Sequence, residues 1–463
     1  MRMALPSNLY LYRMRKFFLA VFLVSGIPAF SQSKPHLFDE TPAQKQQRML
    51  WWTDARFGMF IHWGLYSLAA RHEWVKHNEH LTNEEYQKYF DEFDPDHFDP
   101  KKWAAEAKAA GMKYAVLTTK HHEGFCLFDS KYTDYKAPNT HARRDLVREF
   151  VEAFRAQGLK VGFYYSLLDW HHPDYTMDDA HPLTQVDTSQ ANYDRLNKGR
   201  DMAKYREYLK HQITELMTNY GKIDILWMDW TWDKGDPHGK YAADWGATDL
   251  IKLVRKLQPG IIVNNRLGLD DTYADGGDFQ TPEQVSTQEL LPYRGKVWET
   301  CQTFSGSWGY YRDETSWKTH RQLLDLLITS VANGGNLILN VGPTARGEFD
   351  YRATHALDSL SYWMHANSKA IYDCTYAPAA YPQPEGTKLT YNPSTHRLYV
   401  HCYDFSPGGT LVLPGYAGKI KYAQLLNDDS EIVYTTQGND VVMKMPKVRP
   451  PYDIPVIELC LMY

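Results

Sequence analysis

The sequence has little cysteine and no metal-binding cysteine pattern. Its 463 residues contain five cysteines, and no two of them stand at a C-x-x-C spacing. They are Cys126, Cys301, Cys374, Cys402 and Cys460. An odd number of widely separated cysteines argues against a disulfide-stapled scaffold and against a cysteine-based zinc site. At most one stray disulfide is expected.

Positive charge is also scarce. The formal net charge is −5, and the chain has no long run of lysine and arginine. Because phosphate binding requires clustered basic side chains, nucleic acid is not expected as the main partner. With 43% hydrophobic and 23% charged residues, the composition is that of a globular protein with one large domain and a smaller one.

Aromatic residues, in contrast, are abundant. They make up 14% of the chain, with 14 Trp and 33 Tyr. Flat amphipathic rings suit a ligand with apolar C–H faces and hydroxyl edges, which describes a neutral sugar. Any single ring can equally belong to the hydrophobic core, so the composition alone favours a sugar ligand only weakly.

The N-terminus has the pattern of a secretory signal peptide over residues 1–31. Arg13, Arg15 and Lys16 precede an apolar run from Phe17 to Phe30, which is shorter than the roughly 20 residues of a membrane-spanning helix. A small-residue cleavage pattern ends this run, and no cysteine stands there to carry a lipid anchor. We expect a periplasmic or secreted protein without a membrane anchor, starting at Met1 or Met14.

A repeating unit of helix, glycine and apolar strand fills most of the chain. One example is Asp99-Pro100, then KKWAAEAKAA and Gly111, followed by the β-branched run KYAVLTT. Several such units over about 300 residues predict an α/β fold, a (β/α)8-like TIM-type barrel over residues 36–373. A doubly wound open sheet is the alternative, but no glycine-rich phosphate turn follows an early strand.

The sequence pattern changes after about Ala377, where the helix–strand units end. Short alternating strands such as RLYVHCYDF and DVVMKMP are separated by Gly, Pro, Asn and Asp turns. This pattern predicts a C-terminal β-sandwich over residues 374–463. Two roles are open for it, bracing the barrel or binding glycan, and bracing is the simpler one.

Polar side chains recur where the predicted barrel strands end. In chain order they are His62, His121, His122, Tyr165, Asp169, Asp229 and Arg266. Catalytic groups of such barrels lie at the carboxyl ends of the strands, so five strands that end in this way predict a site there. Asp224 stands five residues before Asp229, roughly 16 Å along an extended strand, and is assigned to the opposite end.

Glycoside cleavage generally takes two carboxyl groups, so Asp229 needs a partner. The candidates downstream are Asp278, Glu283, Glu289 and Glu299. Glu283 follows a turn-rich stretch that suits an acid reaching in from outside the ring of strands. Glu299 is interpreted as the end of a short apolar strand. The residue pattern alone prefers neither.

Nine short motifs occur in an order that resembles the α-L-fucosidases of glycoside hydrolase family 29. They are FGMFIHWG, HEW, KHHEGF, YYSLLDW, LWMDW, NNR, DFQTPEQ, SWGY and NLILNVGP, between about Trp51 and Pro343. The resemblance implies a retaining enzyme, without a metal or other cofactor, that acts on a fucosylated glycan or a small fucoside. Two residues depart from the family pattern: Glu123 stands where Asp is usual, and Trp230 replaces the Gly after the nucleophile and is expected to narrow the pocket mouth.

The resemblance also implies individual roles. Asp229 matches the nucleophile and Glu283 the acid/base, with Glu299 as the alternative acid/base. The positions that match groups around the fucose are His62, Glu73, Trp74, His121, His122, Tyr165, Trp227 and Arg266, with Trp308 near the methyl group.

The same residues allow two alternatives to a fucosidase. A metal-dependent barrel hydrolase would use His62, His121, His122, Asp169 and Asp229 as zinc ligands. Adjacent residues of a strand point to opposite faces, so His121 and His122 are not expected to converge on one ion. A catalytically silent glycan-binding protein on the same scaffold is the second alternative. Linkage preference and oligomeric state have no signal in the sequence.

Overall fold

The computed structural model describes residues 34–232 and 235–462. The predicted signal peptide, residues 1–31, lies outside the described residues. Pro35–Tyr463 forms one compact unit. Within the described ranges, no helix combines the length and the apolar character needed to cross a membrane.

Seven parallel strands form the central sheet, in the order β5-β4-β3-β2-β1-β7-β6. Their bounds are β1 (Phe57–Ile61), β2 (Tyr114–Lys120), β3 (Lys160–Ser166), β4 (Ile225–Asp229), β5 (Ile262–Val263), β6 (Glu299–Thr303) and β7 (Asn336–Val341). Nearly every strand residue is buried, as expected for a parallel sheet covered by helices. The predicted α/β class is therefore confirmed.

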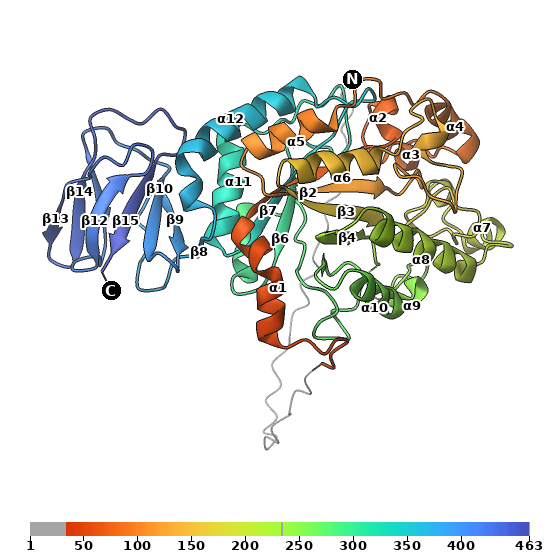
Figure 1. Cartoon of the computed structure of the whole chain (residues 1–463), viewed down its shortest axis with the longest axis horizontal. Coiled ribbons are helices and arrows are strands. Elements are labelled where there is room, and N and C mark those ends of the chain that lie inside the picture. Colours follow the sequence, from red (N-terminus) through yellow and green to blue (C-terminus); the bar gives the residue numbers. More distant parts are fainter. Residues whose placement is uncertain (1–33, 233–234, 463) are drawn as a thin grey trace, which may run out of the picture. The chain divides into compact units, whose positions relative to one another are not determined.

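Helices cover the outside of this sheet, and Figure 1 shows α5, α6, α8 and α10 around strands β2 to β4. The long helices are α1 (Pro42–Ala55), α5 (Pro100–Ala109), α6 (Leu146–Ala156), α8 (Met202–Asn219), α10 (Ala247–Leu257), α11 (His320–Ala332) and α12 (Tyr351–Asn367). Shorter ones are α2 (Tyr66–Ala69), α3 (Val75–Asn78), α4 (Asn83–Asp91), α7 (Gln190–Leu196) and α9 (Ala242–Trp245).

Local sequence explains these helices. Helix α5 begins with Pro100 after Asp99, whose carboxylate accepts from the backbone N–H groups of Lys101 and Lys102. Helix α6 places Phe150 and Phe154 on its buried face. Capping and spacing of this kind are local, so they can be recognised without knowledge of the tertiary fold.

The two edges of the curled sheet, β5 and β6, both contact the irregular segment 278–284. The N–H of Asp278 donates to the carbonyl of Val263 (2.7 Å) at the β5 edge. Glu283 forms a parallel bridge with Cys301 of β6. Segment 278–284, which lies between β5 and β6 in the sequence, is thus held at both edges of the sheet.

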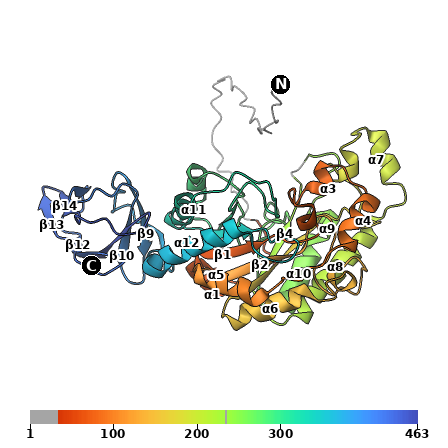
Figure 2. The same ribbon diagram turned by 90° about the horizontal axis from the view of Figure 1, so that it is seen from above.

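Antiparallel strands begin at Thr375 and form a five-stranded sheet (β12-β15-β10-β9-β8) and a three-stranded sheet (β11-β14-β13). They are β8 (Thr375–Tyr376), β9 (Thr387–Asn392), β10 (Arg397–Cys402), β11 (Thr410–Leu413), β12 (Ile420–Leu425), β13 (Tyr434–Gln437), β14 (Asp440–Lys444) and β15 (Val456–Leu461). Side chains from both sheets form one hydrophobic cluster. Figure 2 shows α12 extending toward β9, and the Trp363 indole of α12 donates to the carbonyl of Ile454 (3.0 Å).

All five cysteines lie in the described residues and all are free thiols. Four of them are buried, and burial raises the pKa of the Cys126 and Cys402 thiols to about 12. The stray disulfide that the sequence left open does not form here. These cysteines behave as small core residues.

Candidate active site

A narrow cavity of about 50 Å³ opens at the carboxyl ends of the sheet strands. Nine of the sequence-predicted residues line it: His62, Trp74, His121, His122, Trp227, Asp229, Arg266, Glu283 and Trp308. Trp230, which was expected at the pocket mouth, is also in the wall, and three further wall residues were missed: Phe60, Tyr164 and Cys301. Glu73, Tyr165 and Glu299 are not part of the wall.

Asp229 is the last residue of β4 and is 8% exposed. Its Oδ1 accepts from Nη1 of Arg266 (2.7 Å), and its Oδ2 accepts from the hydroxyl of Tyr164 (2.7 Å). Burial, together with the charge of Asp229, raises the pKa of Tyr164 well above its usual value, so this hydroxyl keeps its proton and donates it. Two strong donors therefore fix a buried carboxylate at the strand end.

Arg266 joins this carboxylate to a second one. Its Nη2 lies 2.5 Å from Oε2 of Glu283, and its guanidinium lies over the ring of Trp227, 4.6 Å from the centroid. Its Nε donates to Oγ1 of Thr281 (2.9 Å). A single guanidinium thus brings Asp229 and Glu283 to the same place and fills the space between them.

The two carboxylates differ in their surroundings. The side chain of Glu283 is 41% exposed, whereas that of Asp229 is 11% exposed. Glu283 lies on the irregular segment between β5 and β6 and is followed by Gln284 with a positive φ of 47°. Asp229 is held rigidly by a strand, while Glu283 stands at the mouth of the cavity on a loop.

Three histidines form another wall, and two have an assignable tautomer. Nδ1 of His62 lies 2.6 Å from Oδ1 of Asn340, an acceptor, so this nitrogen carries the hydrogen. Nδ1 of His122 lies 2.6 Å from Oγ of Ser166, whose own hydrogen is donated to the carbonyl of Leu168 (2.8 Å), so His122 also donates from Nδ1. In both rings Nε2 is left as an acceptor.

Both rings are neutral at ordinary pH. Burial, reinforced by the neighbouring His121, lowers the pKa of His62 and of His122 well below the usual value. Neutral rings with an open Nε2 can accept hydrogen bonds from the hydroxyl groups of a ligand.

The expectation that His121 and His122 point to opposite faces is wrong. Their ring centroids are 4.1 Å apart and both rings line the cavity. Strand β2 ends at Lys120, so strand alternation no longer applies to the two residues that follow. Glu123 is buried, with Oε2 3.5 Å from Nδ1 of His121, and it buttresses that ring from behind.

The placement of Tyr165 is a correction. Its hydroxyl donates to Gln212 of α8 (2.7 Å), on the helix side of β3. Tyr164, the preceding residue, faces the cavity instead. The alternation in KVGFYYS carried a usable signal, because the small residues Gly162 and Ser166 share the face of Tyr164, which is the crowded interior.

Glu73 lies behind the cavity wall. Its Oε2 accepts from the backbone N–H groups of Trp308 (3.1 Å) and Gly309 (2.8 Å). It therefore holds the loop that carries Trp308. The Trp308 ring lies 5.1 Å from that of His62, so Glu73 shapes the wall through this loop.

Glu299 is the first residue of β6, and the interpretation that it ends a strand is wrong. The indole of Trp227 donates to its Oε1 (3.3 Å), and the hydroxyl of Tyr114 donates to its Oε2. Burial raises its pKa to about 7, against the opposing effect of these donors. Glu299 lies beneath Trp227 and does not reach the cavity, which removes it as the alternative acid/base.

The other carboxylates from the sequence also have separate places. Asp224 precedes β4 and accepts from the N–H of Val161 (3.1 Å), at the opposite end from Asp229, as expected. Asp278 is buried against Arg48 and Arg255.

Asp169 pairs with Lys120, with Nζ to Oδ2 at 2.8 Å. Although burial alone would raise it, the Lys120 charge holds the pKa of Asp169 at about 2. The ligand set of the zinc alternative is therefore not assembled as a unit, because Asp169 is engaged elsewhere. Across residues 34–232 and 235–462, no group of three or more His, Cys, Asp or Glu side chains is arranged to hold a metal ion.

Comparisons with known proteins agree with this geometry. The family model described as alpha-L-fucosidase matches residues 28–369. The plasma α-L-fucosidase of Homo sapiens is 30% identical over 372 residues, 75% of this chain and 73% of that protein.

Two solved structures are similar over almost the whole chain. α-L-Fucosidase isoenzyme 1 from Paenibacillus thiaminolyticus is 42% identical, with a TM-score of 0.82 over 90% of this chain and 100% of that chain. A trapped covalent intermediate of an α-L-fucosidase from Bacteroides thetaiotaomicron is 29% identical, with a TM-score of 0.77 over 95% of this chain and 100% of that chain. With the family model covering most of its length, the chain belongs to the α-L-fucosidases of glycoside hydrolase family 29.

Proposed function

We propose that this protein is an exo-acting, retaining α-L-fucosidase that removes terminal α-L-fucosyl residues by double displacement. Asp229 is the nucleophile and Glu283 the acid/base. The observation that carries the assignment is the Arg266 guanidinium, which donates both to Asp229 at the end of β4 and to Glu283 on segment 278–284. Retaining glycosidases place two carboxyl groups close together on either side of the scissile bond.

In the first step, the Asp229 carboxylate attacks the anomeric carbon while Glu283 gives its proton to the departing oxygen. In the second step, Glu283 takes a proton from water, and the water oxygen replaces Asp229 at the anomeric carbon. The donors on Asp229 hold it in position for attack. Support comes from the Bacteroides thetaiotaomicron relative, which was trapped as a covalent intermediate with 2-fluoro-fucosyl fluoride in a glutamate-to-glutamine mutant.

Glu283 must leave Arg266 before it can act as an acid, because an ion-paired carboxylate has no proton to give. Its exposure and its irregular segment allow this movement. The cavity of about 50 Å³ holds a few waters and is too small for a pyranose ring. We infer that fucose entry displaces Glu283 outward and breaks its contact with Arg266.

The remaining wall suits a deoxy sugar with three hydroxyl groups. Nε2 of His62 and Nε2 of His122 accept from hydroxyls, and the Trp74 indole adds a donor to the wall. Trp308 offers an apolar face for the methyl group.

We also infer the remaining architecture and the destination of the chain. Segment 278–284, bonded to β5 and β6, acts as the eighth strand position and completes a (β/α)8-like barrel over residues 36–373. Residues 374–463 form a β-sandwich, supported by the core that the two antiparallel sheets share. The pattern of residues 1–31 supports export to the periplasm or the medium.

Turnover of an aryl α-L-fucoside by Asp229→Gly and Glu283→Ala, each with and without azide, tests the assignment. We expect both variants to lose at least about a hundredfold in kcat. Azide should give the β-fucosyl azide with Asp229→Gly and the α-fucosyl azide with Glu283→Ala. Near-wild-type rates in both variants would refute the roles, and a wild type that binds fucose without turnover would establish the silent glycan-binding alternative.

A further inference from the structure

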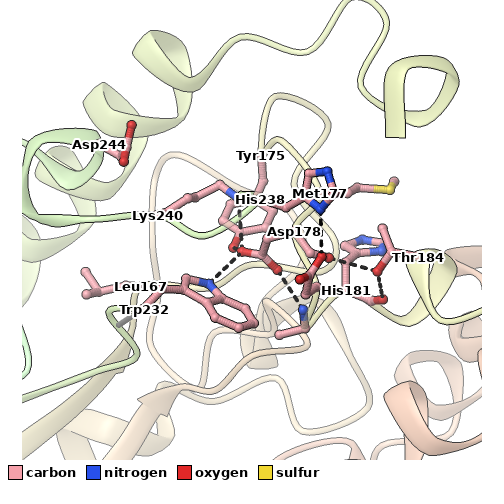
Figure 3. A network of polar contacts seen from close by, with 12 residues as sticks. Leu167, Tyr175, Met177, Asp178, His181, Thr184, Trp232, His238, Lys240 and Asp244 are labelled. Carbon is pink, nitrogen blue, oxygen red and sulfur yellow. Dashed lines mark hydrogen bonds and ion pairs between the residues drawn. The ribbon is translucent and has the colours of Figure 1, made fainter. Parts of the chain in front are cut away.

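Two buried carboxylates outside the active site show how this chain normally accommodates such a group. Figure 3 shows Asp178, on which the ammonium of Lys240 and the indole of Trp232 converge. Lys240 Nζ lies 2.9 Å and Trp232 Nε1 3.4 Å from its Oδ2. Glu215 of α8 accepts from the hydroxyl of Ser130 (2.8 Å) and from a backbone N–H (2.9 Å). Bonding of this kind offsets the cost of removing a charge from water.

Glu123 is an exception beside the active site. It is 1% exposed, yet no protein group in residues 34–232 or 235–462 donates a hydrogen bond to either of its carboxyl oxygens. Its Oε2 lies 3.5 Å from Nδ1 of His121, which has no hydrogen-bond partner either. This distance is longer than an ordinary N–H···O bond. A buried polar group in this state calls for a functional explanation.

The local chain geometry holds the Glu123 carboxyl behind the His121 ring. Strand β2 ends at Lys120, and the N–H of Gly124 then donates to the carbonyl of His121 (3.0 Å), with a φ of 82° at Gly124. Gly64 leaves space for the carboxyl, because a Cβ at this position would lie 2.6 Å from Oε1 of Glu123. Glu123 itself does not line the cavity, so it can act there only through the ring that it faces.

The group facing Nδ1 distinguishes His121 from the other two histidines of the wall. Nδ1 of His62 faces the amide oxygen of Asn340. Nδ1 of His122 faces the hydroxyl of Ser166. Both of these partners are neutral, whereas His121 faces a carboxylate. A carboxylate only accepts hydrogen bonds, so it keeps the ring hydrogen on Nδ1, leaves Nε2 as an acceptor toward the cavity, and makes that nitrogen more basic.

We propose that Glu123 is a positioning residue of the active site, which orients His121 and makes Nε2 of this ring the strongest hydroxyl acceptor in the cavity. This inference rests on the proposed fucosidase activity. When a fucose hydroxyl donates to Nε2, the ring becomes polarised and its Nδ1–H closes on the carboxylate. Hydrogen bonds to sugar hydroxyls strengthen as the transition state forms, so a more basic acceptor favours the transition state over the bound substrate.

Glu123→Gln tests this role, because it removes the charge and keeps the shape. With an aryl α-L-fucoside, kcat should fall about tenfold while KM stays within about twofold, since the weakened interaction belongs to the transition state. The midpoint of urea unfolding should equal that of the wild type or exceed it, because an amide is less costly to bury than an unpaired carboxylate.

Glu215→Gln is the matched control, because it makes the same substitution at a buried glutamate whose two oxygens are both bonded. It should lower the unfolding midpoint and leave kcat and KM within about twofold of the wild type. A double-mutant cycle then locates the effect of Glu123. Once His121 is replaced in His121→Asn, adding Glu123→Gln should change kcat/KM by less than about twofold.

An unchanged kcat in Glu123→Gln would overturn the proposal, and so would a fall in kcat that is accompanied by a lower unfolding midpoint. A tenfold loss that persists in the His121→Asn background would overturn it as well. All three results leave the fucosidase assignment intact as long as the wild type hydrolyses the aryl fucoside. A wild type without turnover would instead refute the fucosidase activity itself.

Discussion

Asp229 is buried at a strand end where an unpaired charge would be costly, and its stability there depends on the groups around it. Tyr164 and Arg266 each donate to one of its oxygens. The same two bonds that offset the desolvation of the carboxylate also orient it toward the cavity. Stability and reactivity at this residue therefore have one structural cause.

Replacing Tyr164 with Phe should reduce activity. Loss of its hydrogen bond to Asp229 frees the carboxylate to rotate, and we expect kcat/KM for an aryl fucoside to fall about tenfold to a hundredfold. The neighbouring variant Tyr165→Phe is the control, because its hydroxyl bonds to Gln212 on the other side of the strand. That variant should retain activity and lose about 1 kcal/mol of unfolding free energy. The reverse pattern would mean that the two tyrosines are exchanged in function.

Glu299 should make stability depend on pH. Its ordinary pKa of 4.5 is raised by burial to about 7, so the folded state binds a proton that the unfolded state has already released. This contribution is fully present below pH 4.5 and is lost as pH rises through 7, by about 1.4 kcal/mol per unit of raised pKa. The free energy of unfolding, measured by urea denaturation, should therefore be lower at pH 8 than at pH 5. A Glu299→Gln variant that keeps the full pH dependence would contradict the assignment.

The site residues differ in how far the sequence could place them. Asp229 and Arg266 follow apolar strands directly, so their end of the sheet was predictable. Glu299 was misplaced because the run before it resembles a strand, whereas Trp298 bridges to Gln280 of the irregular segment and β6 begins one residue later. The local sequence does not show that Trp298 pairs with the irregular segment while Glu299 begins β6, since the partner of Trp298, Gln280, is 18 residues away.

At the level of elements, the loops that follow β3 and β4 are joined by buried polar contacts. Asp178 of the first loop and Lys240 of the second form an ion pair with both side chains almost fully buried. His238 adds a contact to Asp179 (3.0 Å) beside this pair. Two segments that are long and polar in sequence are thereby held in one arrangement next to the active site.

Lys240→Met should therefore be strongly destabilising. It leaves the Asp178 carboxylate buried without its cation, and we expect a loss of about 3–5 kcal/mol in unfolding free energy. Arg312→Met is the matched control, because Arg312 and Asp313 are both more than 60% exposed and such pairs contribute less than about 1 kcal/mol. Chemical denaturation of both variants measures the difference. Equal losses would show that the buried ion pair contributes no more to the unfolding free energy than the exposed one.

The helix and strand units were predictable because their signals are local, and the seven-stranded sheet follows from them. The extended conformation of segment 278–284 was not predictable from the sequence. The segment contains Pro282, which cannot donate to a ladder, and its pairing is made of isolated bridges to Asn264, Trp298 and Cys301. Its extended conformation is imposed by the two sheet edges, which are tertiary features.

At the scale of the whole molecule, the C-terminal sheets share a core with the barrel. Tyr399, Leu426, Ile454 and Val456 belong to the same hydrophobic cluster as the barrel strands and helices α11 and α12. Lys388 of β9 also pairs with Asp325 of α11. Contacts of this kind support a bracing role for residues 374–463, because removing these sheets would expose apolar surface of the barrel helices.

Ile454→Ala tests whether the two parts unfold together. Ile454 is fully buried in the shared core, so a loss of about 2–4 kcal/mol is expected, and a barrel that depends on this core should lose activity in the same thermal transition. Val448→Ala, at a side chain that is 80% exposed, should change unfolding free energy by less than about 0.5 kcal/mol. Tryptophan fluorescence and residual fucosidase activity, followed through one thermal ramp, report on the barrel. If Ile454→Ala unfolded in two steps and kept activity until the second, the C-terminal sheets would be an independent domain and would not brace the site.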